Sequence, residues 1–228
     1  MALHSQIAGS IAFVSGANRG LGRAFAQALV ARGAKVYGGA RDPGTIDDAG
    51  VIPVQLDITD PKSVAAAVAQ CSDTTLLINN AGILRGGGLI GAPNLDGARA
   101  EMETNYFGTL EMSRQFAPVL GRNGGGALVN MASVLSWITF PAVGGYAASK
   151  SAVWSLTDAI RQELSAQNTL VVGVHAGYID TDMAANVAEA KVSPEDVVAQ
   201  VLDAVEAGQE EVLADGLSRA VKAGLGAK

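Results

Sequence analysis

Short apolar runs rich in β-branched residues alternate with longer segments of helical periodicity along almost the whole chain. Strands that are apolar throughout are typical of a parallel sheet covered by helices on both faces. We therefore expect an α/β fold with a single Rossmann-type, doubly wound parallel sheet of about seven strands and helices on both faces. The expected strands are 10–15, 35–39, 51–56, 75–79, 126–132, 170–175 and 211–214, and the clearest helices are 21–31, 61–71, 96–120, 146–167 and 194–207.

Capping residues mark several helix ends. Asp60-Pro61 and Ser193-Pro194 each place a capping side chain before a proline at the first helical position. Gly33 and Gly208 stand where two helices are expected to end. The alternation of strand and helix shows no break in composition, so we expect one domain over residues 1–228.

Composition and charge exclude several classes of function. The net charge of −6 argues against nucleic acid or an anionic membrane as a partner, because either would need a basic surface. Cys71 is the only cysteine, so an internal disulfide is impossible, and His4 and His175 are the only histidines. We therefore expect no bound metal.

The chain shows no export signal or convincing membrane span. Residues 1–9 carry polar and charged side chains where a signal peptide would have an apolar core. The uncharged stretch 123–149 is interrupted by polar residues, Pro141 and several glycines, which favours two buried segments joined by a loop. We expect a cytoplasmic protein without membrane contact.

A glycine-rich turn follows the first expected strand and leads directly into a helix. Such glycines let the backbone turn sharply and approach a pyrophosphate, while the helix N-terminus offers free N–H groups. The spacing differs from G-x-G-x-x-G, and a purely structural turn is the alternative; no G-K-[ST] follows, so a P-loop is excluded. The expected cofactor contacts in this turn are Gly16, Asn18, Arg19, Gly20, Leu21 and Gly22.

The residues after the second strand bear on the choice of dinucleotide. Enzymes that select NAD usually place an acidic side chain there, whereas an arginine suits the 2′-phosphate of NADP. Arg41 occupies this region, and Arg19 offers a second cation. We expect NADP(H) to be preferred over NAD(H). The alternative is that both arginines are solvated and that Asp42 pairs with Arg41.

Three side chains suit acid–base chemistry on a carbonyl or alcohol. Tyr146 and Lys150 are one helical turn apart, so they share a helix face, and a lysine ammonium lowers the pKa of a nearby phenol. Carbonyl reduction needs a proton donor at the oxygen, which Tyr146 can supply. Ser133 stands at the end of the fifth strand, at the sheet edge where such folds bind ligands. Each residue alone is common by chance.

The combination of these motifs resembles the short-chain dehydrogenase/reductase family, in its compact single-domain branch. The resemblance rests on Ser15-Gly16-x-x-x-Gly20-x-Gly22, Asn79-Asn80-Ala81-Gly82, Asn105, Ser133 and Tyr146-x-x-x-Lys150, and it extends from about residue 8 to about residue 214. It implies that Tyr146 is the general acid/base, that Lys150 lowers its pKa and binds the nicotinamide ribose, that Ser133 holds the substrate oxygen, and that Asn105 anchors a water in a proton relay.

The resemblance also implies further cofactor contacts. Asp57 matches the family's contact to the adenine, and Thr181 matches its contact near the carboxamide. Ala176-Gly177 stands where the family commonly has Pro-Gly, and the segment 180–192, where it places a lid, is short. Apart from the glycine turn and Arg41, the expected cofactor-binding positions are Asp57, Ile58, Asn79, Ala81, Gly82, Tyr146, Lys150, Gly177, Ile179 and Thr181.

Apolar residues flank the catalytic positions and predict a hydrophobic ketone, aldehyde or alcohol as substrate. The expected pocket consists of Ser133, Trp137, Phe140, Tyr178 and Met183, with packing in the core as the alternative for the large side chains. The helix from Tyr146 carries Val153, Trp154 and Leu156 on more than one face, and with the resemblance this predicts a homodimer or homotetramer.

These observations predict an NADP(H)-dependent oxidoreductase that interconverts a carbonyl and an alcohol. A non-catalytic NAD(P)-binding redox sensor is the alternative, although such a protein has no need to keep Ser133, Tyr146 and Lys150 together. A sugar-nucleotide epimerase or dehydratase is less compatible, because those relatives have a larger C-terminal substrate region than this chain provides.

Overall fold

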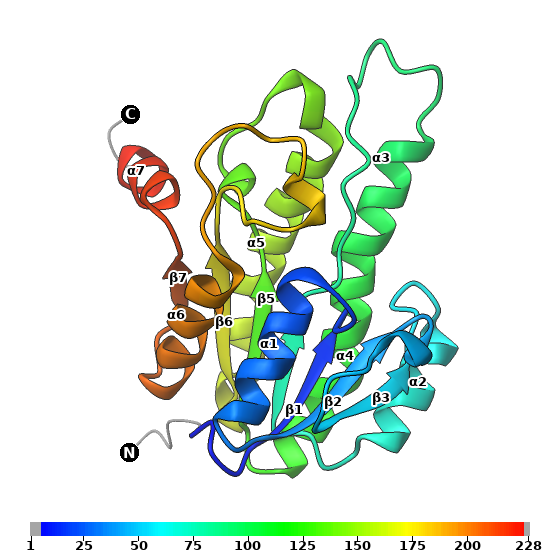
Figure 1. Cartoon of the computed structure of the whole chain (residues 1–228), viewed down its shortest axis with the longest axis vertical. Helices are drawn as coiled ribbons and strands as arrows, with labels where there is room; N and C mark the ends of the chain where they lie inside the picture. The colour runs from blue at the N-terminus through cyan, green and yellow to red at the C-terminus, as the bar shows by residue number, and fades with distance from the viewer. Residues whose placement is uncertain (1–5, 226–228) are drawn as a thin grey trace.

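A computed structural model describes residues 6–225, and its centre is a seven-stranded sheet in which all strands run parallel (Figure 1). The strand order is β3-β2-β1-β4-β5-β6-β7, as expected for a Rossmann-type sheet. The predicted strands are all present, with ends that differ by at most one residue. Their bounds are β1 Ile11–Ser15, β2 Lys35–Ala40, β3 Val51–Gln55, β4 Leu76–Asn79, β5 Ala127–Met131, β6 Leu170–His175 and β7 Glu211–Leu213.

Helices cover both faces of the sheet, so the apolar strands are buried on each side. The helices α1 (Gly20–Ala31) and α6 (Pro194–Glu206) contribute to one core cluster, around Phe25, Leu29 and Val201. On the opposite face, α2 (Pro61–Gln70), α4 (Thr109–Arg122) and α5 (Gly144–Leu164) contribute to the second. The predicted doubly wound α/β architecture is therefore confirmed.

The predicted caps form at both kinds of helix end. The Asp60 carboxylate accepts from the Lys62 amide, and the Ser193 hydroxyl accepts from the Asp196 amide. Gly33 and Gly208 have positive φ angles of 82° and 68° just past α1 and α6. These four residues therefore act as the sequence indicated.

Two helical features differ from the prediction. The expected helix 96–120 is divided into α3 (Asp96–Glu101), a π-helical segment η2 (Met102–Gly108) and α4, so Asn105 lies in the π-helical turn. The chain also forms a helix that was not predicted, α7 (Gly216–Leu225). Leu217, Val221 and Leu225 do repeat at helical spacing, but the segment is short, follows β7 closely and contains Gly216 and Gly224, which weaken a helix prediction.

The chain order reverses between β1 and β4, which creates the crevice where open α/β sheets bind ligands. Segments 82–95, 132–143 and 176–193 rise above the carboxyl ends of the strands, at the top of Figure 1. Short 3₁₀ turns lie in these segments and elsewhere: η1 Pro43–Thr45, η3 Val134–Ser136, η4 Pro141–Val143, η5 Ser165–Gln167 and η6 Asp182–Ala184.

Within residues 6–225, no helix has both the length and the apolar character needed to cross a bilayer. The stretch 123–149 consists of β5, the turns η3 and η4, and the start of α5, which agrees with two buried segments joined by a loop. Residues 1–5, on which the expectation about an export signal partly rests, lie outside the described part of the chain.

Candidate active site

The glycine turn after β1 requires glycine on steric grounds. Gly16 and Gly20 have φ angles of 68° and 52°, in the left-handed region that favours glycine. At Gly22, a Cβ atom would lie only 2.0 Å from the Gly16 carbonyl oxygen. The first turn of α1 therefore packs directly on the backbone of the loop.

The N-terminus of α1 is open toward this loop. Arg19 is the N-cap residue, and its side chain makes no capping hydrogen bond within the described structure. Asn18 and Leu21 are half-buried beside it, and Leu21 packs against the core beneath α1. The first N–H groups of a twelve-residue helix thus face the crevice, as a pyrophosphate site needs.

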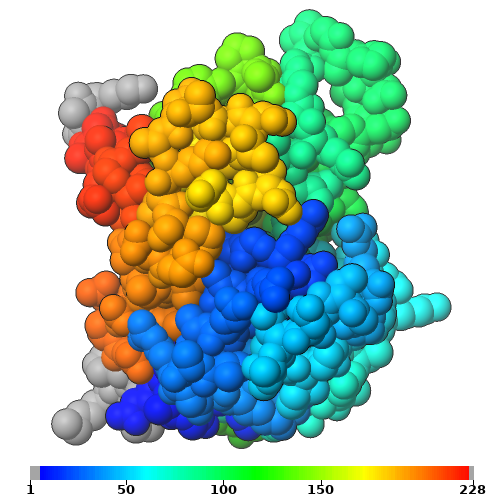
Figure 2. Space-filling model, viewed as in Figure 1, coloured from blue at the N-terminus to red at the C-terminus, as the bar shows by residue number. Residues whose placement is uncertain are grey.

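The turn lies against the segment that follows β6. A Cβ on Gly20 would be 3.4 Å from the Thr181 methyl group, and the exposed Arg19 guanidinium lies 4.0 Å from the Asp182 carboxylate. In Figure 2 the blue turn lies directly below the yellow to orange segment. Ile179 forms a parallel bridge with Val192, and the Gly177 amide donates to Asp215 at 2.5 Å.

Residues after β4 join the ends of β1 and β4. The amides of Asn80 and Ala81 donate to the Ser15 hydroxyl at 3.0 and 3.1 Å, and Asn80 Nδ2 donates to the Ser15 carbonyl at 2.9 Å. A Cβ on Gly16 would be 3.2 Å from the Ala81 Cα. Asn80 and Ser15 were part of the motif but were not predicted as site residues, although they hold the loop in place.

Asn79 lies on the opposite side of the strand from this loop network. Its Nδ2 donates to the Ser113 hydroxyl at 3.1 Å and to Asn130 Oδ1 at 2.9 Å, and Asn130 donates in turn to Thr157 at 3.0 Å. These partners lie on α4, β5 and α5. Asn79 therefore supports the central strands from the face covered by α4 and α5.

Charged residues after β2 and β3 occupy the side expected for the adenosine. Two hydrogen bonds from Thr59 lower the pKa of Asp57, and the positive charge of Arg41 contributes to the same effect. Arg41 is exposed, whereas Ile58 is buried against Gly108. Asp42 accepts from the Gly44 amide at 3.0 Å, and the structure contains no Asp42–Arg41 ion pair within residues 6–225.

Ser133 and Tyr146 lie beside each other at the carboxyl edge of the sheet. Ser133 is buried just beyond β5, where its hydroxyl accepts from the Leu135 amide at 3.1 Å. Tyr146 lies in the first turn of α5. Burial and the negative charge of Glu101 raise its pKa to about 12, and a hydrogen bond with Ser133 opposes this rise.

Lys150 follows Tyr146 by one turn and is buried, with 6% of its surface exposed. Its Nζ donates to the Met131 carbonyl at 2.6 Å and lies 5.6 Å from the centre of the Tyr146 ring. Burial lowers the pKa of Lys150 to about 8. The sequence predicts a lowered pKa for Tyr146, whereas burial and the charge of Glu101 raise it, and the hydrogen bond with Ser133 opposes this rise only in part.

Asn105 uses its side-chain amide to hold the segment after β4. Its Oδ1 accepts from the Ile83 amide at 2.8 Å, and its Nδ2 donates to the Ile83 carbonyl at 3.0 Å and to the Ser149 hydroxyl at 2.9 Å. A Cβ on Gly82 would be 3.1 Å from Asn105 Oδ1. In this structure the side-chain amide of Asn105 therefore supports the main chain of the segment after β4 and the start of α5.

Glu101 is a site residue that the sequence reasoning missed. It is 2% exposed, its Oε1 accepts from the Arg85 and Gly86 amides at 2.8 and 3.1 Å, and its charge acts on Tyr146. Its carboxylate also fills the space in which a residue 145 side chain would lie. The only sequence signal was its position one helical turn before Asn105.

The expected pocket residues divide into two groups. Phe140 and Met183 are each 52% exposed and Tyr178 is 37% exposed, so these three present apolar surface to solvent. Trp137 is instead half-buried and stacks on His175, with 3.9 Å between the ring centres and an angle of 20°.

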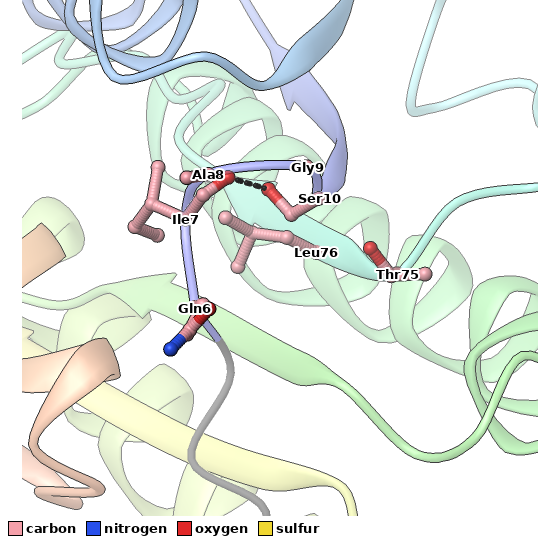
Figure 3. Close-up of a pocket in the computed structure, with 7 residues that line it drawn as sticks. All are labelled: Gln6, Ile7, Ala8, Gly9, Ser10, Thr75 and Leu76. Atoms are coloured by element: carbon pink, nitrogen blue, oxygen red, sulfur yellow. Dashed lines mark hydrogen bonds between the residues drawn. The ribbon is translucent and has the colours of Figure 1, made fainter.

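A hollow of about 210 Å³ lies at the opposite edge of the sheet, where β1 and β4 begin (Figure 3). Its walls carry amide, hydroxyl and apolar groups, and the Ser10 hydroxyl donates to the Ile7 carbonyl at 2.8 Å. It is remote along the strands from Ser133, Tyr146 and Lys150, so we do not assign it to the candidate active site. The lining residues are Gln6, Ile7, Ala8, Gly9, Ser10, Thr75 and Leu76.

Known proteins resemble this chain in both sequence and fold. Residues 10–192 match the family model described as short chain dehydrogenase. Short chain dehydrogenase mpl6 of Monascus purpureus is 32% identical over 217 residues, which cover 87% of this chain and 72% of the relative.

Two solved structures extend the comparison. A short chain dehydrogenase from Burkholderia cenocepacia J2315 in complex with NADP is 42% identical, with a TM-score of 0.94 and coverage of 98% of this chain and 95% of the other. A short chain dehydrogenase/reductase from Burkholderia phymatum in complex with NAD is 26% identical, with a TM-score of 0.85 and coverage of 95% and 93%.

Proposed function

Because the chain belongs to the short-chain dehydrogenase/reductase family, we propose that it interconverts a hydrophobic ketone or aldehyde and the corresponding alcohol, with NADP(H) as the preferred cofactor. NAD(P)-dependent oxidoreduction is the activity of this family. The observation that carries the proposal is the position of Tyr146 beside Ser133 and Lys150 at the carboxyl edge of the sheet.

The glycine turn and α1 fit a dinucleotide. The open helix N-terminus supplies N–H donors and a positive dipole end, and Gly22 lets that helix approach the loop closely. Gly16, Gly20 and Leu21 would hold the pyrophosphate, Asp57 and Ile58 the adenine, and Thr181 the carboxamide end. When bound, the nicotinamide supplies hydride to a carbonyl or accepts it from an alcohol.

Ser133 and Tyr146 would hold the substrate oxygen between two hydroxyl groups. In the reducing direction, hydride adds to the carbonyl carbon while the Tyr146 hydroxyl gives its proton to the oxygen. Because burial and Glu101 raise the pKa of Tyr146 to about 12, its hydroxyl carries that proton at neutral pH. Ser133 donates a second hydrogen bond to the same oxygen and so orients the carbonyl.

Lys150 and Asn105 would support the proton transfer. The Lys150 ammonium lies one turn from Tyr146 and stabilises the phenolate that remains after the proton has left. Its other hydrogens would bind the nicotinamide ribose, in addition to the Met131 carbonyl. Asn105 contacts Ser149 next to Lys150 and would hold a water that returns a proton to this lysine.

The preference for NADP(H) is supported by charge. Arg41 is exposed just beyond β2, and Asp42 caps the next turn instead of neutralising it. Arg19 provides a second exposed guanidinium in the glycine turn. An exposed cation just beyond β2 favours a 2′-phosphate, whereas the carboxylate nearest to the Arg19 guanidinium is Asp182, at 4.0 Å; the Burkholderia cenocepacia relative was crystallised with NADP.

Replacement of the catalytic phenol tests the mechanism. Tyr146→Phe should reduce NADPH-dependent turnover of a ketone panel by at least about a thousandfold while the Kd for NADPH changes less than about threefold. Tyr37→Phe is a matched control, because Tyr37 lies in β2 and its hydroxyl points to Asp73 at 3.4 Å, a residue with no role in the proposed site. Normal turnover by the Tyr146→Phe protein would overturn the mechanism.

Titration of both dinucleotides tests the cofactor preference. Wild-type protein should bind NADPH more tightly than NADH, and Arg41→Ala should reduce this preference by about tenfold with little effect on NADH. Lys62→Ala removes an exposed cation from the first turn of α2 and serves as the control. Equal binding of the two dinucleotides by the wild-type protein and the Arg41→Ala variant would refute the role of Arg41.

We also infer that the protein forms a homo-oligomer, on the basis of the family relationship. Val153 and Leu156 are already buried within a single chain, so these two residues of α5 give no evidence for a second subunit. Phe107 is 48% exposed on η2 and provides apolar surface on the preceding helix. Light scattering coupled to size-exclusion chromatography would detect the dimer or tetramer, and a monomer at micromolar concentration would refute this inference.

A further inference from the structure

His175 is a buried titratable residue that has no role in the proposed mechanism. It ends β6, is 1% exposed, and places Nδ1 3.0 Å from the carbonyl oxygen of Ser133. A carbonyl oxygen can only accept a hydrogen bond, so Nδ1 carries the hydrogen in this contact. Burial also lowers the pKa of His175, which agrees with a neutral ring.

The same imidazole also supports the other end of the turn that follows Ser133. Ser133 precedes η3 and Trp137 ends it, and the Trp137 ring stacks on His175 at 3.9 Å. The His175 side chain therefore donates to Ser133, just before this turn, and stacks on Trp137, at its end. Ser136, within the turn, donates to the Lys150 carbonyl at 2.9 Å, which connects the turn to α5.

The C-terminal helix covers Trp137 from outside. Lys222 on α7 places Nζ 4.9 Å from the centre of the Trp137 ring and 2.7 Å from the Glu211 carboxylate. Trp154 meets the edge of Trp137, with 6.2 Å between the ring centres. These contacts surround Trp137 with protein groups, so the indole is better placed to support the turn than to contact a substrate.

We propose that His175 is a positioning residue for Ser133, and that it acts by fixing the main chain of the turn through the Ser133 carbonyl and the Trp137 ring. This inference rests on the proposed role of Ser133 in holding the substrate oxygen. The direction of the Ser133 hydroxyl depends on the position of its main chain and on the Leu135 amide, which donates to it at 3.1 Å. The bond that the hydroxyl donates to the Ala176 carbonyl is long, at 3.4 Å. A displaced main chain would therefore misdirect the hydroxyl, and misplacement by about 1 Å can cost about a hundredfold in rate.

Two substitutions separate the hydrogen bond from the stacking. His175→Asn retains an N–H donor near the position of Nδ1 but removes the ring, whereas His175→Phe retains a ring but removes the donor. We expect His175→Phe to lower kcat by about tenfold with the Kd for NADPH within about twofold of wild type. His175→Asn should retain kcat within about threefold.

The inference is tested most directly in a Ser133→Ala background. If His175 acts through Ser133, adding His175→Phe to Ser133→Ala should lower kcat by less than about twofold. A full further tenfold loss in the double variant would overturn the proposal, as would equal kcat values for the Phe and Asn variants. A Ser133→Ala protein with normal turnover would instead show that the proposed role of Ser133 has failed, before any His175 variant is considered.

A spectroscopic measurement on the wild-type protein does not depend on whether a His175 variant folds. The chain contains two histidines, so nitrogen-15 labelling of histidine gives two ring systems, and His4→Ala assigns them. The proposal requires that His175 is neutral with its proton on Nδ1 at pH 7. An unprotonated Nδ1 would rule out donation to the Ser133 carbonyl and overturn the proposal.

Discussion

Gly22 is the position at which a single methyl group would disturb the proposed pyrophosphate site most severely. A Cβ at this residue would lie 2.0 Å from the Gly16 oxygen, 2.5 Å from Asn80 Nδ2 and 2.8 Å from the Gly16 carbonyl carbon. The nearest of these atoms belongs to backbone, and Asn80 is itself held by the Ser15 carbonyl. Gly22→Ala therefore requires that α1 and the glycine loop move apart.

The size of the effect follows from this geometry. The contact with the Gly16 oxygen must open by about 1.4 Å to reach an ordinary van der Waals distance. Overpacking of a rigid interior costs about 1–3 kcal/mol, and we expect the upper end because backbone lies on both sides. Movement of α1 also withdraws its first N–H groups, and loss of one hydrogen bond to a charged phosphate raises the Kd by about tenfold to a hundredfold.

Urea unfolding and fluorescence titration with NADPH measure the two consequences separately. Gly224→Ala in α7 is the matched control, because its Cβ would meet nothing within 4 Å and alanine favours a helix. The control should leave the Kd unchanged and keep or raise the free energy of unfolding. A Gly22→Ala protein with wild-type stability and a wild-type Kd would refute the steric argument.

Three further substitutions test the electrostatics and the caps. Burial lowers the pKa of Lys150 from 10.5 to about 8, so its charge costs about 3 kcal/mol of folding free energy below pH 8. Lys150→Met removes this cost but also the hydrogen bond to the Met131 carbonyl, so it should abolish turnover yet raise the free energy of unfolding at pH 7 by about 2 kcal/mol, a gain that shrinks from pH 8 to 10.5. Urea unfolding that shows no gain at pH 7 would contradict this. Glu101→Gln should lower the pKa of Tyr146 and shift the alkaline rise in the kcat of alcohol oxidation to lower pH, whereas an unmoved profile would exclude the influence of Glu101. Ser193→Ala removes the cap of α6 and should lower the free energy of unfolding by about 1 kcal/mol with kcat unchanged. Ser155→Ala, on the exposed side of α5, is the control, and equal stability of the two variants would count against the cap.

Much of the fold could be predicted because each signal is local. Strands buried on both faces form continuous apolar runs, and Asp60 and Ser193 cap helices with hydrogen bonds to amides two and three residues later. The π-helical turn around Asn105 was not predictable in this way. It places the Asn105 amide against Ile83, a partner 22 positions away whose contact leaves no periodic trace in the sequence.

In the candidate site, the positions of the residues could be predicted from the sequence, but their electrostatic surroundings could not. Gly16, Gly20, Ser133, Tyr146 and Lys150 belong to spaced motifs, and the structure brings each to the carboxyl edge of the sheet. The pKa shifts of these residues could not be predicted, because they depend on which charged groups are buried beside them. A helix spacing placed Lys150 near Tyr146, but it gave no indication that Glu101 would approach the same phenol from α3.

Burial moves the two central groups of this site toward their neutral forms. It raises the pKa of Tyr146 to about 12 and lowers that of Lys150 to about 8. A neutral phenol is the form needed to donate a proton to a carbonyl, so the protein groups alone prepare the site for reduction. Alcohol oxidation instead requires the phenolate, and its stabilisation must come from the Lys150 ammonium and from the positive charge of an oxidised nicotinamide. In the proposed mechanism, the same residues would therefore favour proton donation, and the charge of an oxidised cofactor would be needed to reverse this balance.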